Sequence, residues 1–347
     1  MRILLVAHSF PRNPTDMAGS FLLALAKGVQ SQGHDVTAVV PHAAGLASQE
    51  TLDGVRVRRY RYAADASETL AYHGTMHEQV LASWRARFRM IKFIRASRRE
   101  TLRAVAELAP DVIHVHWWFP GGFAVWPLAG RVPPVVLTSH GTDLFLLDRF
   151  APARPVAKRV FRFADEVTVI STPLVNRVQA MGVPHERITV IPMPVLPSVF
   201  DTAGAEPRDP SLLLFVGRLI ERKGCAYALE ALRALRNAGR DVRLTVIGDG
   251  PELDSLRRRA ADLDVAGQVA FTGALAPGQV AQWNRRASVL LMPAVTDWKG
   301  EQEGFGMVLV EAMLSDLSIV ASRSGGIPDL IDHERTGLLV PERDPEA

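Results

Sequence analysis

The sequence is short of cysteine and of long apolar runs. Its 347 residues include a single cysteine, Cys225, so no intrachain disulfide can form, which suits a reducing compartment such as the cytoplasm. The opening "MRILLV" is too short for a signal-peptide core or a membrane span and instead predicts a first β-strand. A net charge of +3 is too small to indicate nucleic acid as a partner.

What the sequence does contain is an alternation of short apolar runs with helical segments, repeated in two halves. The first half carries "RILLVA", "DVTAVV", "DVIHVH", "PVVLTSH" and "EVTVIS", and the second carries "LLLFVG", "VRLTVIG", "QVAFTG", "ASVLLMP" and "SIVAS". Apolar strands that alternate with helices indicate parallel sheets covered on both faces. The predicted fold class is therefore α/β, with two Rossmann-like doubly wound domains at 1–198 and 209–347 that face each other across a cleft.

The first strand leads into a loop that lacks the "GxGxxG" pattern of dinucleotide oxidoreductases. Gly19 in this loop precedes an expected helix, where backbone amides and the helix dipole favour an anion. A glycine at such a place is more often only a turn residue, so Gly19 by itself is a weak signal.

The second half offers stronger candidates for a phosphate site. In "LLLFVGRLIERKGC" a strand ends before Arg218, and Lys223 follows five residues later. An arginine fork and a mobile lysine suit a diphosphate, although two solvated surface cations are the plainer interpretation. Gly248 and Gly250 in "VIGDGPE" mark another strand-to-helix turn at the same sheet edge.

The stretch "EQEGFGMVLVEAM" places Glu303 and Glu311 around an apolar run, where an ionised carboxylate needs a polar partner. Gly304, Phe305 and Gly306 predict a loop that opens a helix, whose first amides can meet phosphate. Glu303 can then accept hydrogen bonds from sugar hydroxyls, and Glu311 can accept from a pair such as a ribose diol. Alternatively, Glu303 only complements the helix dipole and Glu311 lies on a solvated face.

Together these segments resemble the retaining nucleotide-sugar glycosyltransferases of family 4, which have the GT-B architecture. The resemblance rests on "GRLIERKG", "VIGDGPE", "VAFTG", "EGFGMVLVEAM" and "GGIPDLI....TGLLV", in that order, with "GHDVTAVVP" and "DVIHVH" in the first half. It implies an acceptor-side first domain and a donor-binding second domain. It also implies that one set of residues holds the donor and its reacting sugar: Gly19, His140, Arg218, Lys223, Glu303 and Glu311.

Several histidines compete for the position beside the reacting sugar. His140 ends a strand before a glycine, which predicts exposure at the cleft, and His116, Trp117 and Asp143 are the acceptor-side candidates. The alternation of His114 with His116 in "HVH" also fits a metallohydrolase site in which His140 and Asp143 are further ligands. That alternative is disfavoured because the sequence indicates two wound domains, not a closed barrel.

Three further features concern metal binding and differences from the family pattern. Asp262 and Asp264 form a "DxD", but they fall at an expected helix end, so no metal and no cofactor is expected. Asp316 and Ser318 replace the glycine and proline of the usual turn, which aspartate tolerates in the left-handed conformation. The sequence stops at "PERDPEA", where relatives run on into a last helix.

The predicted reaction is transfer of a hexosyl unit from a nucleoside diphosphate sugar to a hydroxyl acceptor, with retention of configuration. A sugar-nucleotide epimerase and a non-catalytic sugar-nucleotide-binding protein remain as alternatives. Cations and helix-start amides would take up the charge that grows on the leaving diphosphate.

Residues 84–103 carry eight arginines and lysines against one acid. Trp84, Phe88, Ile91 and Ile94 recur at helical spacing, and Arg85, Arg89, Lys92, Arg99 and Arg103 concentrate toward another side. Such a helix can lie in the headgroup region of an anionic membrane, or it can simply pack on the first domain. The hypothesis is a cytoplasmic enzyme that contacts the inner leaflet peripherally and meets a lipid-linked acceptor there.

Overall fold

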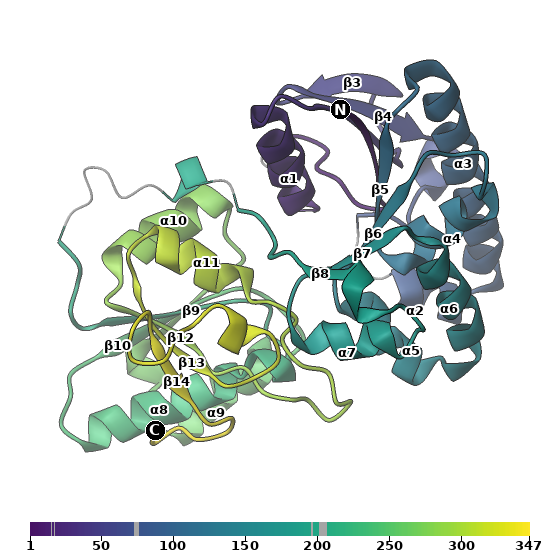
Figure 1. Cartoon of the computed structure of the whole chain (residues 1–347). Helices are drawn as coiled ribbons and strands as arrows, with labels where there is room; N and C mark the ends of the chain where they lie inside the picture. The colour runs from purple at the N-terminus through teal and green to yellow at the C-terminus, as the bar shows by residue number, and fades with distance from the viewer. Residues whose placement is uncertain (15, 17, 73–75, 196, 201–206) are drawn as a thin grey trace. The chain divides into compact units, whose positions relative to one another are not determined.

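The computed structural model describes the chain except residues 15, 17, 73–75, 196 and 201–206. It divides into two compact units, Met1–Pro194 (unit 1) and Val195–Ala347 (unit 2), each built on a sheet with helices around it (Figure 1). The sequence placed the domains at 1–198 and 209–347, and residues 201–206 of the intervening stretch lie outside the described residues.

Unit 1 contains an eight-stranded sheet, sheet A, in the order β3-β4-β2-β1-β5-β6-β7-β8. Its strands are β1 (Arg2–Val6), β2 (Asp35–Pro41), β3 (Gln49–Leu52), β4 (Val55–Tyr60), β5 (Val112–His116), β6 (Val135–Ser139), β7 (Glu166–Val169) and β8 (Ile188–Val190). Its α-helices are α1 (Ser20–Ser31), α2 (Met76–Ala82), α3 (Trp84–Leu108), α4 (Phe123–Val125), α5 (Thr142–Arg149), α6 (Arg154–Phe163) and α7 (Pro173–Gln179). Because β1, β5 and β6 pair in parallel, their carboxyl ends lie at the same edge of the sheet.

One pair in sheet A is antiparallel, and the sequence analysis did not anticipate it. β3 and β4 form a hairpin whose two turn residues, Asp53 and Gly54, have φ of 48° and 87°. Positive φ at both positions of a two-residue loop is the geometry that suits the right-handed twist of a hairpin.

Unit 2 contains a six-stranded sheet, sheet B, in the order β11-β10-β9-β12-β13-β14, with parallel pairing between its strands. Its strands are β9 (Leu212–Val216), β10 (Arg243–Ile247), β11 (Val269–Gly273), β12 (Val289–Met292), β13 (Ser318–Ser322) and β14 (Leu338–Val340). Its α-helices are α8 (Cys225–Asn237), α9 (Leu253–Asp262), α10 (Pro277–Arg286) and α11 (Met307–Leu314).

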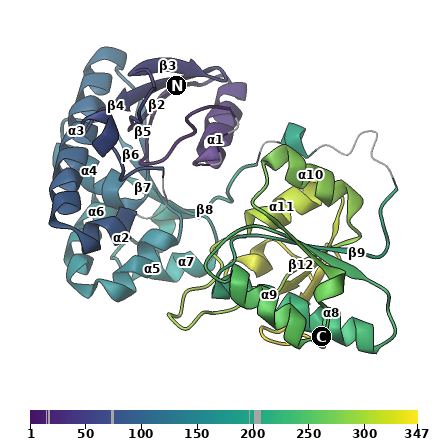
Figure 2. The ribbon, with the colours of Figure 1, turned by 180° about the vertical axis from the view of Figure 1, so that it is seen from behind.

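Apolar side chains cover both faces of sheet B, as fully buried parallel strands require. One core cluster joins the strands to Leu229, Leu232 and Leu256 of α8 and α9. The other joins them to Val280 and Leu309 of α10 and α11. Figures 1 and 2 show the two helix pairs on opposite faces of the sheet. This layering leaves the carboxyl ends of the strands free to carry loops.

Helix α3 is long, and its two sides differ. Met90, Phe93 and Ile94 are buried in unit 1, so Ile94 does not belong to an exposed apolar stripe as the sequence predicted. Arg89 was also expected on the cationic surface, but its guanidinium donates to the carbonyl of Ser67 and the hydroxyl of Thr69. Within the described part of the chain, no helix is both long enough and apolar enough to cross a bilayer.

Candidate functional site

In unit 2 the loops at the carboxyl ends of β9 and β10 approach each other so closely that glycine is required. A Cβ on Gly248, whose φ is 146°, would lie 1.9 Å from the carbonyl oxygen of Gly217, and one on Gly250 would lie 2.4 Å from that of Leu219. The Lys223 side chain passes 3.8 Å from the position of a Cβ on Gly217. These glycines therefore allow the two loops to pack closely beside Lys223 and do not serve only as flexible turn residues.

Lys223 and Glu303 form an ion pair between the amine Nζ and the carboxylate Oε2. Glu303 is only 9% exposed, so the partner that a buried carboxylate requires is present within the chain. Burial alone would raise the pKa of Glu303, but the Lys223 ammonium and Arg222 outweigh it and hold that pKa below its usual value. Arg222 is itself held by Glu301 at 2.7 Å. The result is an ionised acid with a fixed lysine beside it.

The backbone of Glu303 is fixed from the other side by the turn after β13. The amide of Gly326 donates to the Glu303 carbonyl at 2.9 Å. A Cβ on Gly325, whose φ is 52°, would lie 2.0 Å from that carbonyl oxygen. Side chain and backbone of Glu303 are thus held by segments that follow β9 and β13.

Glu311 lies within α11, and none of the described residues supplies a hydrogen-bond partner for its carboxylate. Burial raises its pKa to about 7. A carboxyl group without a partner can accept hydrogen bonds from hydroxyl groups of a ligand, and a strongly shifted pKa is typical of groups in functional sites. The same sequence signal that predicted this site therefore marks a carboxylate that the fold leaves unsatisfied.

The remaining donor-side candidates occupy different environments. Arg218 is exposed and pairs with none of the carboxylates in the described residues, so its guanidinium is available to an anion. Gly306 caps the start of α11 with φ of 93°, as the loop before a helix predicted, and Gly304 lies in that loop. Phe305 is only 2% exposed. Its side chain is part of the core, so it can contribute its backbone amide but not its ring to a ligand.

In unit 1 the histidines gather where β1, β5 and β6 end. His116 Nδ1 and His140 Nε2 are 3.0 Å apart, within hydrogen-bond distance, and the indole of Trp117 lies 4.4 Å from the His140 ring. Burial is the largest factor that lowers the pKa of His140, to about 3, and it also lowers that of His116 well below 6.5. Both rings are therefore neutral at pH 7. The buried Nδ1 of His140 and Nε2 of His116 have no partner within the described residues.

Asp143 is buried next to this cluster. Its Oδ1 accepts hydrogen bonds from the Ser139 hydroxyl at 2.8 Å and from the His140 amide at 3.2 Å, and its Oδ2 accepts from the Trp118 amide at 3.1 Å. Burial raises the pKa of Asp143, and these hydrogen bonds oppose the shift. The carboxylate ties the loops after β5 and β6 together and so fixes the backbone that carries His140.

Two residues of this cluster were missed by the sequence analysis. His8 lies just after β1, with its ring 4.2 Å from that of Trp117. Phe21, in the first turn of α1, lies 5.1 Å from the His140 ring. Gly19 caps α1 with φ of 75°, and its hypothetical Cβ would lie 2.9 Å from the backbone of Phe10. The segment "AHSF" after the first strand was the available signal, because it puts a histidine at the same sheet edge.

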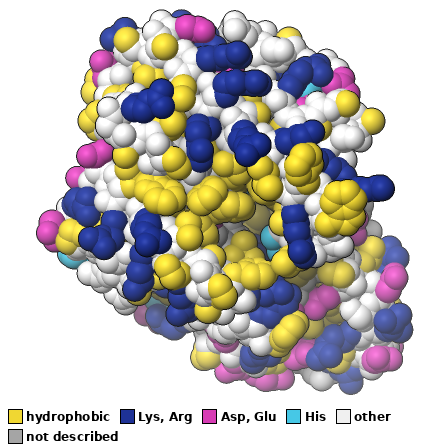
Figure 3. Space-filling model, turned by 90° about the vertical axis from the view of Figure 1, so that its right-hand side faces the viewer, with side chains coloured by type: hydrophobic (Ala, Val, Ile, Leu, Met, Phe, Trp, Pro, Cys, Tyr) yellow, Lys and Arg dark blue, Asp and Glu magenta, His cyan; other side chains and the backbone are white. Residues whose placement is uncertain are grey.

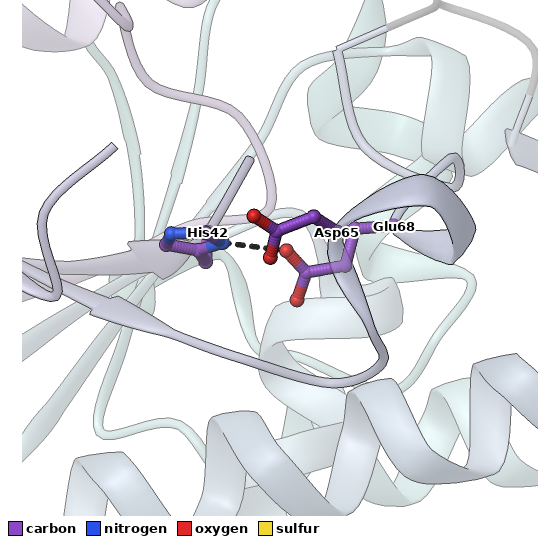
Figure 4. A group of neighbouring side chains, drawn as sticks. All are labelled: His42, Asp65 and Glu68. Carbon is purple, nitrogen blue, oxygen red and sulfur yellow. Dashed lines mark hydrogen bonds and ion pairs between the residues drawn. The ribbon is translucent and has the colours of Figure 1, made fainter. Parts of the chain in front are cut away.

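The described residues do not gather His114, His116, His140 and Asp143 into a metal-binding set. His114 Nε2 lies 2.6 Å from the Thr138 hydroxyl, and His116 and His140 engage each other. The group whose possible ligand atoms all lie within 4.8 Å is instead His42, Asp65 and Glu68 (Figure 4). Asp262 ends α9 and Asp264 pairs with Arg236, so the "DxD" falls at a helix end as expected.

The triad of Figure 4 is already engaged in hydrogen bonds of its own. His42 Nδ1 lies 2.5 Å from Glu68 Oε2, and its Nε2 lies 2.7 Å from the carbonyl of Leu46. Glu68 also accepts from the Tyr62 amide at 2.9 Å, and Asp65 pairs with Arg61. The arrangement fastens the segment after β4 to the end of β2.

Comparison with known proteins decides the family. Residues 18–194 match the Glycosyl transferase 4-like domain, and residues 200–347 match the Glycosyl transferases group 1 family. The chain belongs to the group 1 glycosyltransferases. It is 31% identical over 245 residues to an amylovoran biosynthesis glycosyltransferase of Erwinia amylovora, an alignment that covers 69% of this chain and 60% of that protein.

A second relative aligns over nearly the whole of this glycosyltransferase. It is the GDP-mannose-dependent alpha-(1-6)-phosphatidylinositol monomannoside mannosyltransferase of Mycobacterium tuberculosis, 27% identical over 357 residues, with coverage of 99% of this chain and 86% of the relative. The alignments span less than two thirds of several curated relatives, namely 60% of the Erwinia amylovora protein and 52% of a putative colanic acid biosynthesis glycosyltransferase of Escherichia coli.

Solved structures agree on the fold. Sucrose-phosphate synthase from Thermosynechococcus elongatus superposes with a TM-score of 0.74 at 21% identity, covering 100% of this chain and 87% of that one. HepE of Anabaena, in complex with UDP, gives 0.68 at 18% identity, covering 99% and 87%. The predicted family and the predicted GT-B class, with two Rossmann-like α/β units, are confirmed.

Proposed function

We propose that this group 1 glycosyltransferase moves a hexosyl unit from a nucleoside diphosphate sugar to a hydroxyl acceptor, with retention of anomeric configuration and without an obligatory metal. The observations that carry the proposal are the Lys223–Glu303 pair at the carboxyl edge of sheet B and, in the helix that follows Glu303, the buried carboxyl of Glu311 without a partner among the described residues. Such a site does not need a large number of positive charges, because one lysine and one arginine can compensate the negative charge of a diphosphate.

On the donor side, Arg218 and Lys223 bind the diphosphate, and the backbone amides of the loop that holds Gly304 and Gly306 add hydrogen bonds. Glu303 accepts hydrogen bonds from the sugar, and Glu311 accepts from the ribose diol. The cations do their main work as the bond to the sugar breaks, because negative charge then grows on the leaving diphosphate. The similar HepE structures with UDP and with UDP-glucose support a donor of this class.

For the acceptor, the proposal assigns residues of unit 1: His140 is placed beside the reacting sugar carbon, and His116 and Trp117 are placed toward the acceptor. A neutral imidazole is suited to this place, since it can donate or accept a hydrogen bond without placing a positive charge against a developing oxocarbenium ion. Asp143 supports this group by accepting a hydrogen bond from the His140 amide.

The deciding experiment incubates the protein with a panel of nucleotide sugars and a panel of hydroxyl acceptors, followed by extraction of lipid and soluble products. Proton NMR of the product should show the anomeric configuration of the donor. Activity should survive chelation, and elemental analysis should find no zinc. Conversion of the nucleotide sugar without any acceptor would identify an epimerase, and binding without turnover would identify a non-catalytic protein.

The acceptor is proposed to be lipid-linked, and residues 84–103 are proposed to make peripheral contact with an anionic membrane. The support is the basic amphipathic helix α3 and the relative from Mycobacterium tuberculosis, whose acceptor is a phosphatidylinositol monomannoside by its name. A lipid-linked acceptor should give product in the organic extract, whereas a soluble acceptor should give it in the aqueous phase.

A further inference from the structure

Four of the large hydrophobic side chains that are exposed in the described structure crowd into eleven residues. They are Leu81, Trp84, Phe88 and Ile91, with exposed fractions of 47%, 72%, 54% and 48%. The last three recur at i, i+4 and i+7 along α3 and so form one stripe on its outer side. The opposite side of α3 is buried in unit 1, so the exposed stripe does not contribute to the core of that unit.

A second set of aromatic side chains continues this surface from another part of the chain. Phe119, Phe123 and Trp126 are half-buried and follow one another with ring centroids 5.8 and 6.2 Å apart. Their segment packs against α3, and the Arg98 guanidinium of α3 donates to the Ala124 carbonyl at 3.1 Å. The same segment packs against α6 on its other side. We call the surface made by α3, residues 118–128 and α6 the α3–α6 face.

Cations border the apolar centre of this face on both helices. From Trp84 to Arg99, α3 contains no acid, and α6 contains none at all. None of the described carboxylates pairs with the exposed Arg85, Lys92, Arg95 or Arg99 of α3, nor with Lys158, Arg159 or Arg162 of α6. Figure 3 looks onto this side of the molecule and shows hydrophobic side chains in the middle with lysine and arginine around them.

Two of these cations already lie over the exposed rings. The Arg85 guanidinium is 5.6 Å from the Trp84 ring centre, and the Lys92 amine is 5.0 Å from that of Phe88. Arginine and lysine whose stems run along aromatic rings can keep their charge in the headgroup layer while the rings enter the acyl boundary. A second copy of the chain does not fit this surface, because it would bring the same unpaired cations together.

We propose that the α3–α6 face is a docking surface for an anionic phospholipid bilayer, with Trp84, Phe88 and Ile91 inserted into the interface and the cations of both helices on the phosphates. The inference widens the contact from helix α3 to a face made by three segments. It rests on the proposed function only for its purpose, which is to hold the enzyme where a lipid-linked acceptor lies.

The test uses the full chain and two kinds of vesicles, phosphatidylcholine alone and phosphatidylcholine mixed with phosphatidylglycerol. We expect sedimentation with the anionic vesicles, weaker at higher salt, and little with the neutral ones. The triple variant Arg85→Glu, Lys92→Glu and Lys158→Glu should lower the partition coefficient at least about tenfold, since each cation near the surface contributes to it. The matched variant Arg240→Glu, Arg258→Glu and Lys299→Glu makes the same change in net charge at exposed positions in unit 2 and should retain binding.

Insertion is tested separately from charge. Quenching of tryptophan fluorescence by brominated phospholipid should fall strongly in Trp84→Phe, and Trp84→Ser with Phe88→Ser should weaken vesicle binding about tenfold without changing nucleotide affinity. Absence of binding to anionic vesicles at low salt would overturn the proposal, as would an equal loss in the control triple variant. So would binding of duplex DNA or self-association through Trp84 in place of vesicle binding. Because the assay contains no substrate, vesicle binding without transfer would count against the proposed function alone.

Discussion

Lys223 and Glu303 are 80 positions apart in the chain and form an ion pair at the carboxyl edge of sheet B. Both side chains are largely buried, with exposed fractions of 20% and 10%. The pair holds the acid ionised and the lysine in place before any donor arrives. It also makes the two residues interdependent, which leads to the first prediction.

Lys223→Met should destabilise unit 2 by about 2–3 kcal/mol, because it leaves Glu303 buried without its counter-charge. The double variant Lys223→Met with Glu303→Gln should recover much of that loss, since the remaining amide carries no charge. Denaturant unfolding of the single and double variants measures the coupling. Equal stability of the two would show that the pair does not offset the burial of Glu303.

Arg218→Ala should weaken binding of a nucleoside diphosphate by roughly tenfold to a hundredfold, the effect of losing one charge-assisted hydrogen bond of about 1.5–3 kcal/mol. Stability should hardly change, because Arg218 is exposed and pairs with no described carboxylate. Calorimetric titration gives the affinity. Arg240→Ala removes an equally exposed arginine elsewhere in unit 2 and should bind as the wild type does; unchanged affinity in Arg218→Ala would remove this residue from the donor site.

His140→Ala should abolish transfer and leave nucleoside diphosphate binding nearly intact, since the ring belongs to unit 1 and the two cations proposed to bind the diphosphate, Arg218 and Lys223, belong to unit 2. The pKa of His140 lies at about 3, lowered chiefly by burial. Its ionisation therefore should not appear as a step in the rate between pH 5 and 8. Single-turnover rates across that range provide the measurement, and wild-type turnover by His140→Ala would transfer the role to His116.

Glu311→Gln should raise stability most at alkaline pH. The folded-state pKa of Glu311 is about 7, raised by burial from the ordinary value of 4.5. The folded protein therefore binds more protons than the unfolded chain between these values, so the wild type loses stability as pH rises from 4.5 to 7. The variant lacks this loss and should gain of order 1 kcal/mol above pH 7, after allowance for partial exposure.

Thermal unfolding at pH 5 and pH 8 measures that difference, with Asp241→Asn as an exposed control in the same unit. The same variant should bind the nucleoside diphosphate more weakly, because an amide replaces a carboxylate that accepts from both ribose hydroxyls. A gain in stability that is independent of pH would contradict the assignment of the shifted group.

Gly325→Ala should destabilise unit 2 by at least about 2 kcal/mol and weaken donor binding. The new methyl would need to fit where the Glu303 carbonyl lies 2.0 Å away, at a φ of 52° that alanine disfavours. Gly278 in α10 has no atom within 4 Å of its hypothetical Cβ, so Gly278→Ala should be neutral or slightly stabilising. Melting temperatures of the two variants should move in opposite directions or differ by several degrees.

The sequence by itself determined the local structure and the location of the sheet edges. Continuous apolar runs broken by glycine indicated buried parallel strands, because both faces of such strands are covered. The left-handed turn expected at Asp316 is present, with φ of 50°, and Gly306 begins α11 from a left-handed position, as a loop before a helix requires. These features depend on the residue and its neighbours, so they can be predicted without knowledge of the rest of the chain.

Only the tertiary structure decided which of these residues meet. Strand order and loop path bring Lys223 to Glu303, and they bring His8 and Phe21 to the ring cluster around His140. Helical spacing likewise gave the stripe on α3 but not its depth: Ile94 is buried in the core, while Trp84 is exposed. Periodicity specifies which residues share a side of a helix, whereas burial depends on what the fold packs against that side.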